Sequence, residues 1–356
     1  MNKKLIAVAL AALPAAAMAD VTLYGTIEAG IENGKTYSYD FAKDGGKLKS
    51  GTRIDDTGSL IGFKGSEDLG NGLKAIWQVE QGLNIDGTTG SASGNGYDNT
   101  FATRDSFVGL QGDFGKVRIG KLSTYNNSDM GNPDNWIYGK GVNGLYYSSI
   151  NILDGRVKNA LRYDSPEFAG FRASALYGVD ESRAYTTDGK RTNKATWNLG
   201  LGYQNAGYFA DFGYVGLQDQ NTAGDKNGNY WRLEGGYNAN NLFLAGYYGQ
   251  GKLYGTNPLG LTDFSLTGNE ELKYREAGVT VGYTIGALTP KFSYGRLWNL
   301  KIDGEKQDEK INQYIVGVDY ALSKRTTTYA SLGYAHHSDD ALETERTLAV
   351  GVKHKF

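Results

Sequence analysis

The chain ends with Thr347-Leu348-Ala349-Val350-Gly351-Val352-Lys353-His354-Lys355-Phe356, and the side chains of this stretch alternate in polarity. One parity holds Leu348, Val350, Val352 and Phe356, and the other holds Thr347, Gly351, Lys353 and Lys355. Because successive side chains of a β-strand point to opposite faces, the pattern predicts a strand with one apolar and one polar face. The same alternation recurs along almost the whole chain, so amphipathic strands are expected to dominate the fold.

The first nineteen residues have the features of an export signal. Asn2-Lys3-Lys4 is a short basic segment, Leu5 to Ala17 is apolar, and Ala17-Met18-Ala19 is a small-x-small cleavage pattern before Asp20. The apolar run is too short to span a bilayer as a helix. We therefore expect residues 1–19 to be removed as a signal peptide and residues 20–356 to form a single exported domain.

Composition narrows the class of protein further. Removing 19 of the 356 residues leaves 337, which is large for an average domain but ordinary for a large barrel. The formal net charge of −2 becomes −4 once two signal-peptide lysines are removed, so no bulk basic field for nucleic acid exists. The chain has no cysteine, which excludes disulfides, thiolate metal sites and thiol nucleophiles.

Sixteen segments show the alternation, and the connections between them are alternately short and long. Short connections include Asn205-Ala206-Gly207, whereas long ones include residues 34–56 and 123–154. The second strand is expected to begin near Thr57. Seven short and eight long connections joining an even number of strands are typical of a bacterial outer-membrane barrel. The predicted fold is all-β, a sixteen-stranded antiparallel transmembrane β-barrel with short periplasmic turns and long outer loops.

Aromatic residues lie near strand ends on the apolar parity, where the body of a tyrosine can meet lipid while its hydroxyl meets water. The set comprises Tyr203, Tyr237, Tyr283, Tyr320 and Phe356, with either Tyr208 or Phe209. Phe356 together with Leu348, Val350 and Val352 is expected to be the assembly signal that the barrel-insertion machinery reads.

Several longer strings carry a family resemblance. They are residues 20–25, 61–77, 114–122, 162–170, 322–326 and 352–356, which span nearly the whole of the exported chain. They resemble the neisserial class of general porins in the Gram-negative porin family. The resemblance implies a homotrimeric diffusion channel in the outer membrane of a Gram-negative bacterium, with the third long loop folded into each barrel. It also implies contact with outer-membrane lipid and lipopolysaccharide, passage of small ions and hydrophilic solutes, no cofactor and no nucleic acid.

In a channel, the chemistry is the arrangement of charge at the narrowest level. The inward parity of adjacent strands carries Lys64, Lys74, Arg104, Arg118, Lys158, Arg162 and Arg172. We expect these side chains to be hydrated and to face a third loop that contributes Asp129 and Asp134, giving a weak anion preference. The preference is modest because screening in water acts over roughly 8 to 10 Å. Glu28 and Gln111 depart from the neisserial pattern, which often has basic residues at these positions.

Three other classes of protein compete with a general porin. The inner face of the barrel could hold a binding ladder, as in a substrate-specific channel. A barrel enzyme needs a serine, histidine and acid together, but His336 and His337 lie near an outer loop and His354 near the opposite end. A soluble carbohydrate-binding β-protein would use the tyrosines as sugar platforms, yet it would not need sixteen alternating strands. No catalytic or metal-binding residues are predicted.

Overall fold

The structure, a computed structural model, describes residues 21–37, 43–44, 47–87, 101–145, 155–186, 188–254, 269–340 and 342–356. The first strands are β1 (Thr22–Lys35), β2 (Lys43–Asp44), β3 (Lys47–Leu48), β4 (Gly51–Asp56), β5 (Leu60–Gly70), β6 (Leu73–Gly82), β7 (Ser106–Gly112), β8 (Gly115–Ser123), β9 (Arg156–Asp164) and β10 (Phe171–Gly178). The later strands are β11 (Thr196–Asn205), β12 (Tyr208–Leu217), β13 (Gly228–Ala239), β14 (Leu242–Tyr254), β15 (Glu271–Tyr283), β16 (Leu288–Ile302), β17 (Glu305–Lys306), β18 (Ile311–Ala321), β19 (Thr326–His337) and β20 (Glu345–Lys355).

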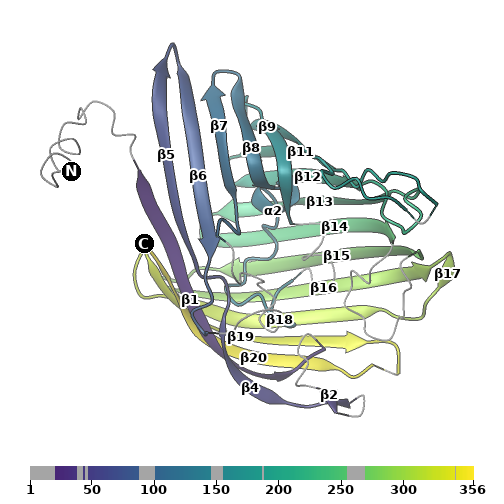
Figure 1. Cartoon of the computed structure of the whole chain (residues 1–356). Helices are drawn as coiled ribbons and strands as arrows, with labels where there is room; N and C mark the ends of the chain where they lie inside the picture. Colours follow the sequence, from purple (N-terminus) through teal and green to yellow (C-terminus); the bar gives the residue numbers. More distant parts are fainter. Residues whose placement is uncertain are drawn as a thin grey trace, which may run out of the picture.

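The main sheet closes on itself as an antiparallel barrel (Figure 1). β1 pairs with β20 on one edge, with Gly30 opposite Gly351, and with β4 and β5 on its other edge. The eighteen segments of this sheet make sixteen barrel strands, because β4 and β5 are two parts of one strand and β17 only extends the β16 hairpin. The predicted sixteen-stranded antiparallel barrel is confirmed.

The second barrel strand begins earlier than the sequence predicted. It begins with β4 at Gly51 rather than near Thr57, and it is interrupted between Asp56 and Leu60. The backbone N–H groups of Gly58 and Ser59 each donate to Asp56 Oδ1 at 2.9 Å. Aspartate side chains favour turns because they bond the backbone a few residues ahead. These two local bonds interrupt the backbone hydrogen-bond ladder between β4 and β5, which are the two parts of one barrel strand.

The two faces of the barrel wall differ as the alternation requires. On β13, Leu233 is 52% exposed, whereas its neighbours Arg232 and Glu234 are almost fully buried on the opposite face. Exposed apolar side chains lie on the outward face of most barrel strands, as a lipid-facing surface needs. Tyr208 lies opposite the outward Tyr237, with their ring centroids 4.8 Å apart. Tyr208, and not Phe209, is therefore the interface aromatic at this position.

One short helix, α2 (Tyr125–Ser128), interrupts the described part of the third loop. The Thr124 side chain accepts a hydrogen bond from the Asn127 N–H at 3.3 Å and caps the helix. Figure 1 places α2 within the curve of the barrel, next to β11 and β12. Among the described residues, no helix has the length and apolar character needed to cross a bilayer.

Candidate pore constriction

The described part of the third loop, residues 124–145, lies against the inner wall of the barrel. Near its start, the Tyr125 N–H donates to Asn198 Oδ1 of β11 at 2.6 Å. Further along, the Gly131 N–H donates to both carboxylate oxygens of Glu234 on β13 at 3.0 Å. The loop is thus fixed to inward-facing side chains and occupies part of the lumen.

The same loop continues across the later strands. The Trp136 indole Nε1 donates to Ser293 Oγ of β16 at 2.8 Å, and Gln313 of β18 donates to the carbonyl of Gly144 at 2.6 Å. Lys140 reaches the far side, where its Nζ lies 3.0 Å from the carboxylate of Asp55 on β4. The described loop therefore crosses the lumen and narrows it; the rest of the predicted loop, residues 146–154, is outside the described residues.

Glycines on the inner wall leave room for the loop. A Cβ at Gly200 of β11 would overlap the ring of Tyr125, and a Cβ at Gly213 of β12 would overlap the amide of Asn126. At Gly333 of β19, a Cβ would overlap the backbone of Val142. Close backbone approach of this kind is a reason for glycine inside a strand. Because these positions have no side chains, the loop can lie directly against the inner wall.

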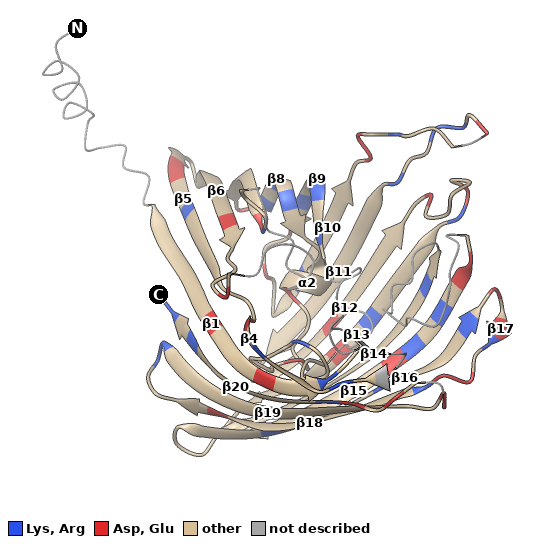
Figure 2. Cartoon of the chain, turned by 60° about the horizontal axis from the view of Figure 1, so that its bottom comes forward, with Lys and Arg blue, Asp and Glu red and all other residues tan. Residues whose placement is uncertain are grey.

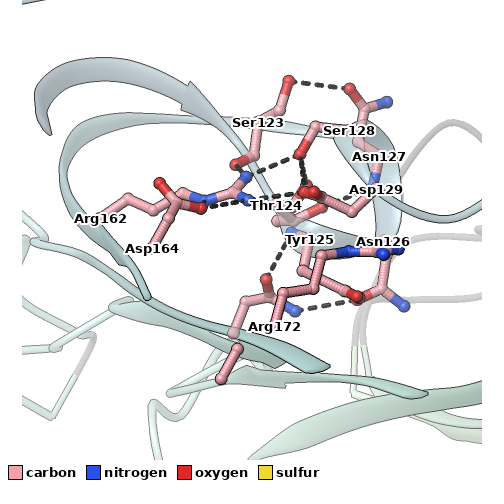
Figure 3. A network of polar contacts seen from close by, with 12 residues as sticks. Ser123, Thr124, Tyr125, Asn126, Asn127, Ser128, Asp129, Arg162, Asp164 and Arg172 are labelled. Carbon is pink, nitrogen blue, oxygen red and sulfur yellow. Dashed lines mark hydrogen bonds and ion pairs between the residues drawn. The ribbon is translucent and has the colours of Figure 1, made fainter. Parts of the chain in front are cut away.

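Arg162 of β9 joins the wall to the start of the loop (Figure 3). Its Nη1 donates to the Ser123 carbonyl and to Ser128 Oγ, both at 2.7 Å, and its Nη2 lies 2.6 Å from Asp129. Its Nε donates to Asp164 at 2.8 Å, and the side chain is only 2% exposed. The expectation of a hydrated arginine is wrong at this position, because the loop covers the guanidinium and uses all of its nitrogens.

Two further arginines join this network through acids. Arg118 Nη2 lies 2.6 Å from Asp164 Oδ2, so one carboxylate bridges Arg118 and Arg162. Arg172 Nη2 lies 2.5 Å from Asp211 Oδ1, which also accepts the hydroxyl of Tyr125 at 2.6 Å. The structure therefore brings Arg118, Arg162, Arg172 and Asp129 together, with carboxylates that compensate their charge.

Other predicted charges are compensated elsewhere on the wall. Arg104 Nε lies 2.6 Å from Glu80, and Glu28 lies 2.8 Å from Lys353 Nζ. Figure 2 shows acidic and basic residues intermixed around β12 to β16. The lumen is thus lined by paired charges rather than by one basic wall facing an acidic loop.

Asp134 lies apart from Asp129, in the middle of the loop. Its Oδ1 accepts the Leu145 N–H at 2.9 Å. Burial raises the pKa of this carboxyl to about 6, although the Leu145 bond and the positive charges of Lys291 and Arg232 oppose the shift. Asp134 is therefore a group in the loop whose charge changes near neutral pH.

Three predicted lysines lie outside the arginine network. Lys64 is exposed, and its Nζ lies 5.1 Å from the centroid of the Tyr24 ring. Lys74 is exposed next to the turn at Gly72. Lys158 precedes Asn159, whose φ of 54° is left-handed, where the register between β8 and β9 shifts. This bulge breaks the alternation that assigned Lys158 to the inward face. None of the three forms an ion pair with a described carboxylate.

The acids that neutralise the wall were not predicted from the sequence. Asp164 and Asp211 lie on the inward parity of their strands, so the alternation that selected the arginines could also have selected them. Glu234 lies two residues after Arg232 on the same face and carried the same signal. Lys140 lies in an irregular loop, where no periodicity indicates direction.

Comparisons with known proteins agree with this architecture. The sequence matches the family described as Gram-negative porin over residues 7–340. It is 37% identical to the major outer membrane protein P.IB of Neisseria gonorrhoeae and 39% identical to that of Neisseria lactamica, in each case over the full length of both chains.

Among solved structures, the chain is similar to an anion-selective porin from Comamonas acidovorans, with a TM-score of 0.71 and 23% identity. The match covers 95% of this chain and 100% of that one, and at this identity it supports the fold. The closed barrel, the apolar outer face and the full-length relatives lead to one conclusion: this chain belongs to the Gram-negative porin family and is an integral outer-membrane porin that forms a channel.

Proposed function

We propose that the protein is a homotrimer of water-filled channels through which ions and small hydrophilic solutes diffuse, with a weak preference for anions. The observation that carries this proposal is the third loop, which is bound to the inner wall from β11 to β18 and narrows the lumen. A narrowed, charge-lined and water-filled passage supports conduction with mild selectivity. The anion selectivity named for the Comamonas porin is in line with this proposal.

The charge balance of the described lumen explains why the preference is weak. Arg118, Arg162 and Arg172 are each within 2.7 Å of a carboxylate, so together they add little net field. Lys64 and Lys74 are exposed and have no such partner among the described carboxylates. These two lysines would supply most of the uncompensated positive charge, and screening would limit their reach to roughly 8 to 10 Å.

Ion selectivity can be tested in planar bilayers under a KCl gradient. The wild-type zero-current potential is expected to have the sign of anion preference, and the double variant Lys64→Gln/Lys74→Gln is expected to move it toward zero. Lys324→Gln, at an exposed turn, is the matched control and should leave the potential unchanged. Equal potentials for the wild type and the double variant would show that these lysines do not set selectivity.

We also propose that assembly proceeds through the two termini. Residues 1–19 act as a signal peptide that is removed, and the apolar parity of β20 with Phe356 is read by the barrel-insertion machinery. Support comes from the exposure of Leu348, Val350, Val352 and Phe356, which lie between 42% and 52% exposed on one outward stripe.

A further inference from the structure

A cavity of about 520 Å³ lies where one end of each of the strands β9 to β12 meets the start of the third loop. Gly178 of β10, Thr196 of β11 and Leu217 of β12 line it, and the strand registers place them opposite one another. Asn198, two residues after Thr196 and therefore on the same face, binds the third loop. The cavity therefore borders the inner side of the barrel wall, and its volume is in the range of small-molecule sites.

One part of the cavity lining is apolar. Val157, Val215 and Leu217 contribute aliphatic side chains to it. Val157 lies directly against Gly178, where an added Cβ would overlap it. Removing aliphatic carbon from water at such a surface is favourable. The cavity is therefore suited to a solute that has an apolar portion as well as polar groups.

Three basic residues line the same cavity and have donors to offer. Arg156 donates through its Nε to Asp105 at 2.7 Å, and no acceptor among the described residues takes its two terminal nitrogens. Lys158 and Lys194 are exposed, and neither ammonium group has an acceptor in the described part of the chain. Guanidinium and ammonium groups form strong, charge-assisted hydrogen bonds with carboxylates. This side of the cavity can therefore bind the carboxylate of a solute.

Two acidic residues line the cavity from the connection between β10 and β11. Asp180 accepts the backbone N–H of Lys194 at 2.7 Å and the hydroxyl of Ser182 at 2.8 Å. Backbone N–H bonds, that of Lys194 first, lower the pKa of Asp180 to about 2, so this carboxylate is charged at neutral pH. Glu181 is exposed and pairs with no cation of the described residues. The acidic side of the cavity can therefore bind an ammonium group.

We propose that this cavity binds zwitterionic solutes, namely short peptides with free termini and an apolar side chain. Arg156 and Lys194 bind the carboxylate of the peptide, and Asp180 and Glu181 bind its ammonium group. With Asp105 included, the three basic and three acidic residues of the site balance, so a simple anion or cation gains less than a solute that carries both charges. The proposal rests on the proposed channel function and names a class of solute for it.

The test is a saturation-transfer NMR titration of the folded protein in detergent, with the dipeptide alanyl-leucine as the probe. Lys194→Gln and Glu181→Gln are each expected to weaken binding about tenfold or more, because each removes one charge-assisted contact. The matched controls Lys324→Gln and Glu167→Gln make the same changes in exposed turns at the other end of the barrel and should bind as the wild type does. Heat-modifiable migration on a gel establishes that each variant is folded.

Dipeptides that lack one terminal charge identify which residue meets which group. N-acetyl-alanyl-leucine has no ammonium group, so it should bind the wild type about tenfold more weakly, and Glu181→Gln should not weaken it further. Alanyl-leucine amide has no carboxylate, so it should also bind more weakly, and Lys194→Gln should not weaken it further.

Undiminished binding of alanyl-leucine by either variant, or equal binding of the zwitterion and either blocked dipeptide, would overturn the proposal. Equal binding of the acetylated dipeptide would identify the cavity as a simple anion site instead. The titration uses no ionic current. Dipeptide binding by folded protein that does not conduct would therefore support this site and contradict the channel proposal alone, so the two proposals fail independently.

Discussion

At the scale of single residues, Arg162 shows how an inward arginine can serve the loop rather than the permeating ion. Its guanidinium binds the Ser123 carbonyl, Ser128 and Asp129 on the loop side, and it binds Asp164 on the wall. A charge reversal at Arg162 would therefore disturb the loop and selectivity together. Arg118, which pairs with Asp164 and has its Cζ 5.1 Å from the centroid of the Phe107 ring, is the cleaner position for a selectivity experiment.

Arg162→Ala should destabilise the barrel, because it leaves Asp129 and Asp164 without their shared cation. Breaking a buried ion pair costs about 3–5 kcal/mol, and we expect the lower end because both carboxylates retain some contact with water. Urea unfolding followed by tryptophan fluorescence measures the loss. The exposed Lys74→Ala is the control and should change stability by no more than about 0.5 kcal/mol; equal stability of both variants would contradict the structural role of Arg162.

Asp134 should make selectivity depend on pH. Since burial raises its pKa to about 6, the carboxyl gains a proton as pH falls through that value, and the loop loses a negative charge. Anion preference is expected to increase between pH 7 and pH 5. Because the folded state holds this proton more tightly than the unfolded state, the same carboxyl contributes stability below about pH 4 that is lost as pH rises through 6. Asp134→Asn should reduce both dependences, and an unchanged pH profile in that variant would assign them to other groups.

At the scale of elements, the third loop and the inner-wall glycines depend on each other. Gly200→Val should push Tyr125 away from β11 and into the lumen, which narrows the passage and predicts a smaller single-channel conductance. The control is Gly246→Val on the outward face of β14, where the nearest atom to an added Cβ is a carbonyl oxygen at 3.3 Å. Identical conductance of the Gly200 variant and the wild type would show that the loop does not limit the current.

The strands were predictable from the sequence because a period of two is imposed by geometry at every barrel strand. The failures lie where that period is interrupted. The Asp56 turn splits one strand, and the left-handed Asn159 shifts Lys158 from its assigned face. The contacts of the third loop were not predictable, because they depend on tertiary pairing with residues far along the chain, such as Glu234 and Gln313.

At the scale of the whole molecule, the two ends of the described chain close the barrel. The backbone of Phe356 exchanges hydrogen bonds with Gly25 of β1 at 3.1 and 3.2 Å, and its ring lies over the same glycine. Deleting Phe356 should remove the last pair of the closing seam and the exposed terminal aromatic. We expect exported but protease-sensitive protein in place of folded barrel. Normal yield of folded protein would show that the terminal residue is dispensable for assembly.

The central claim is that a loop fixed inside a sixteen-stranded barrel leaves a narrowed, water-filled channel in each subunit of a trimer. Single-channel recording of the purified, folded protein in a planar bilayer tests it most directly. We expect stepwise conductance that closes in three equal decrements, with smaller steps for Gly200→Val than for the wild type. Folded protein that inserts but carries no current would show that the barrel does not form an open channel.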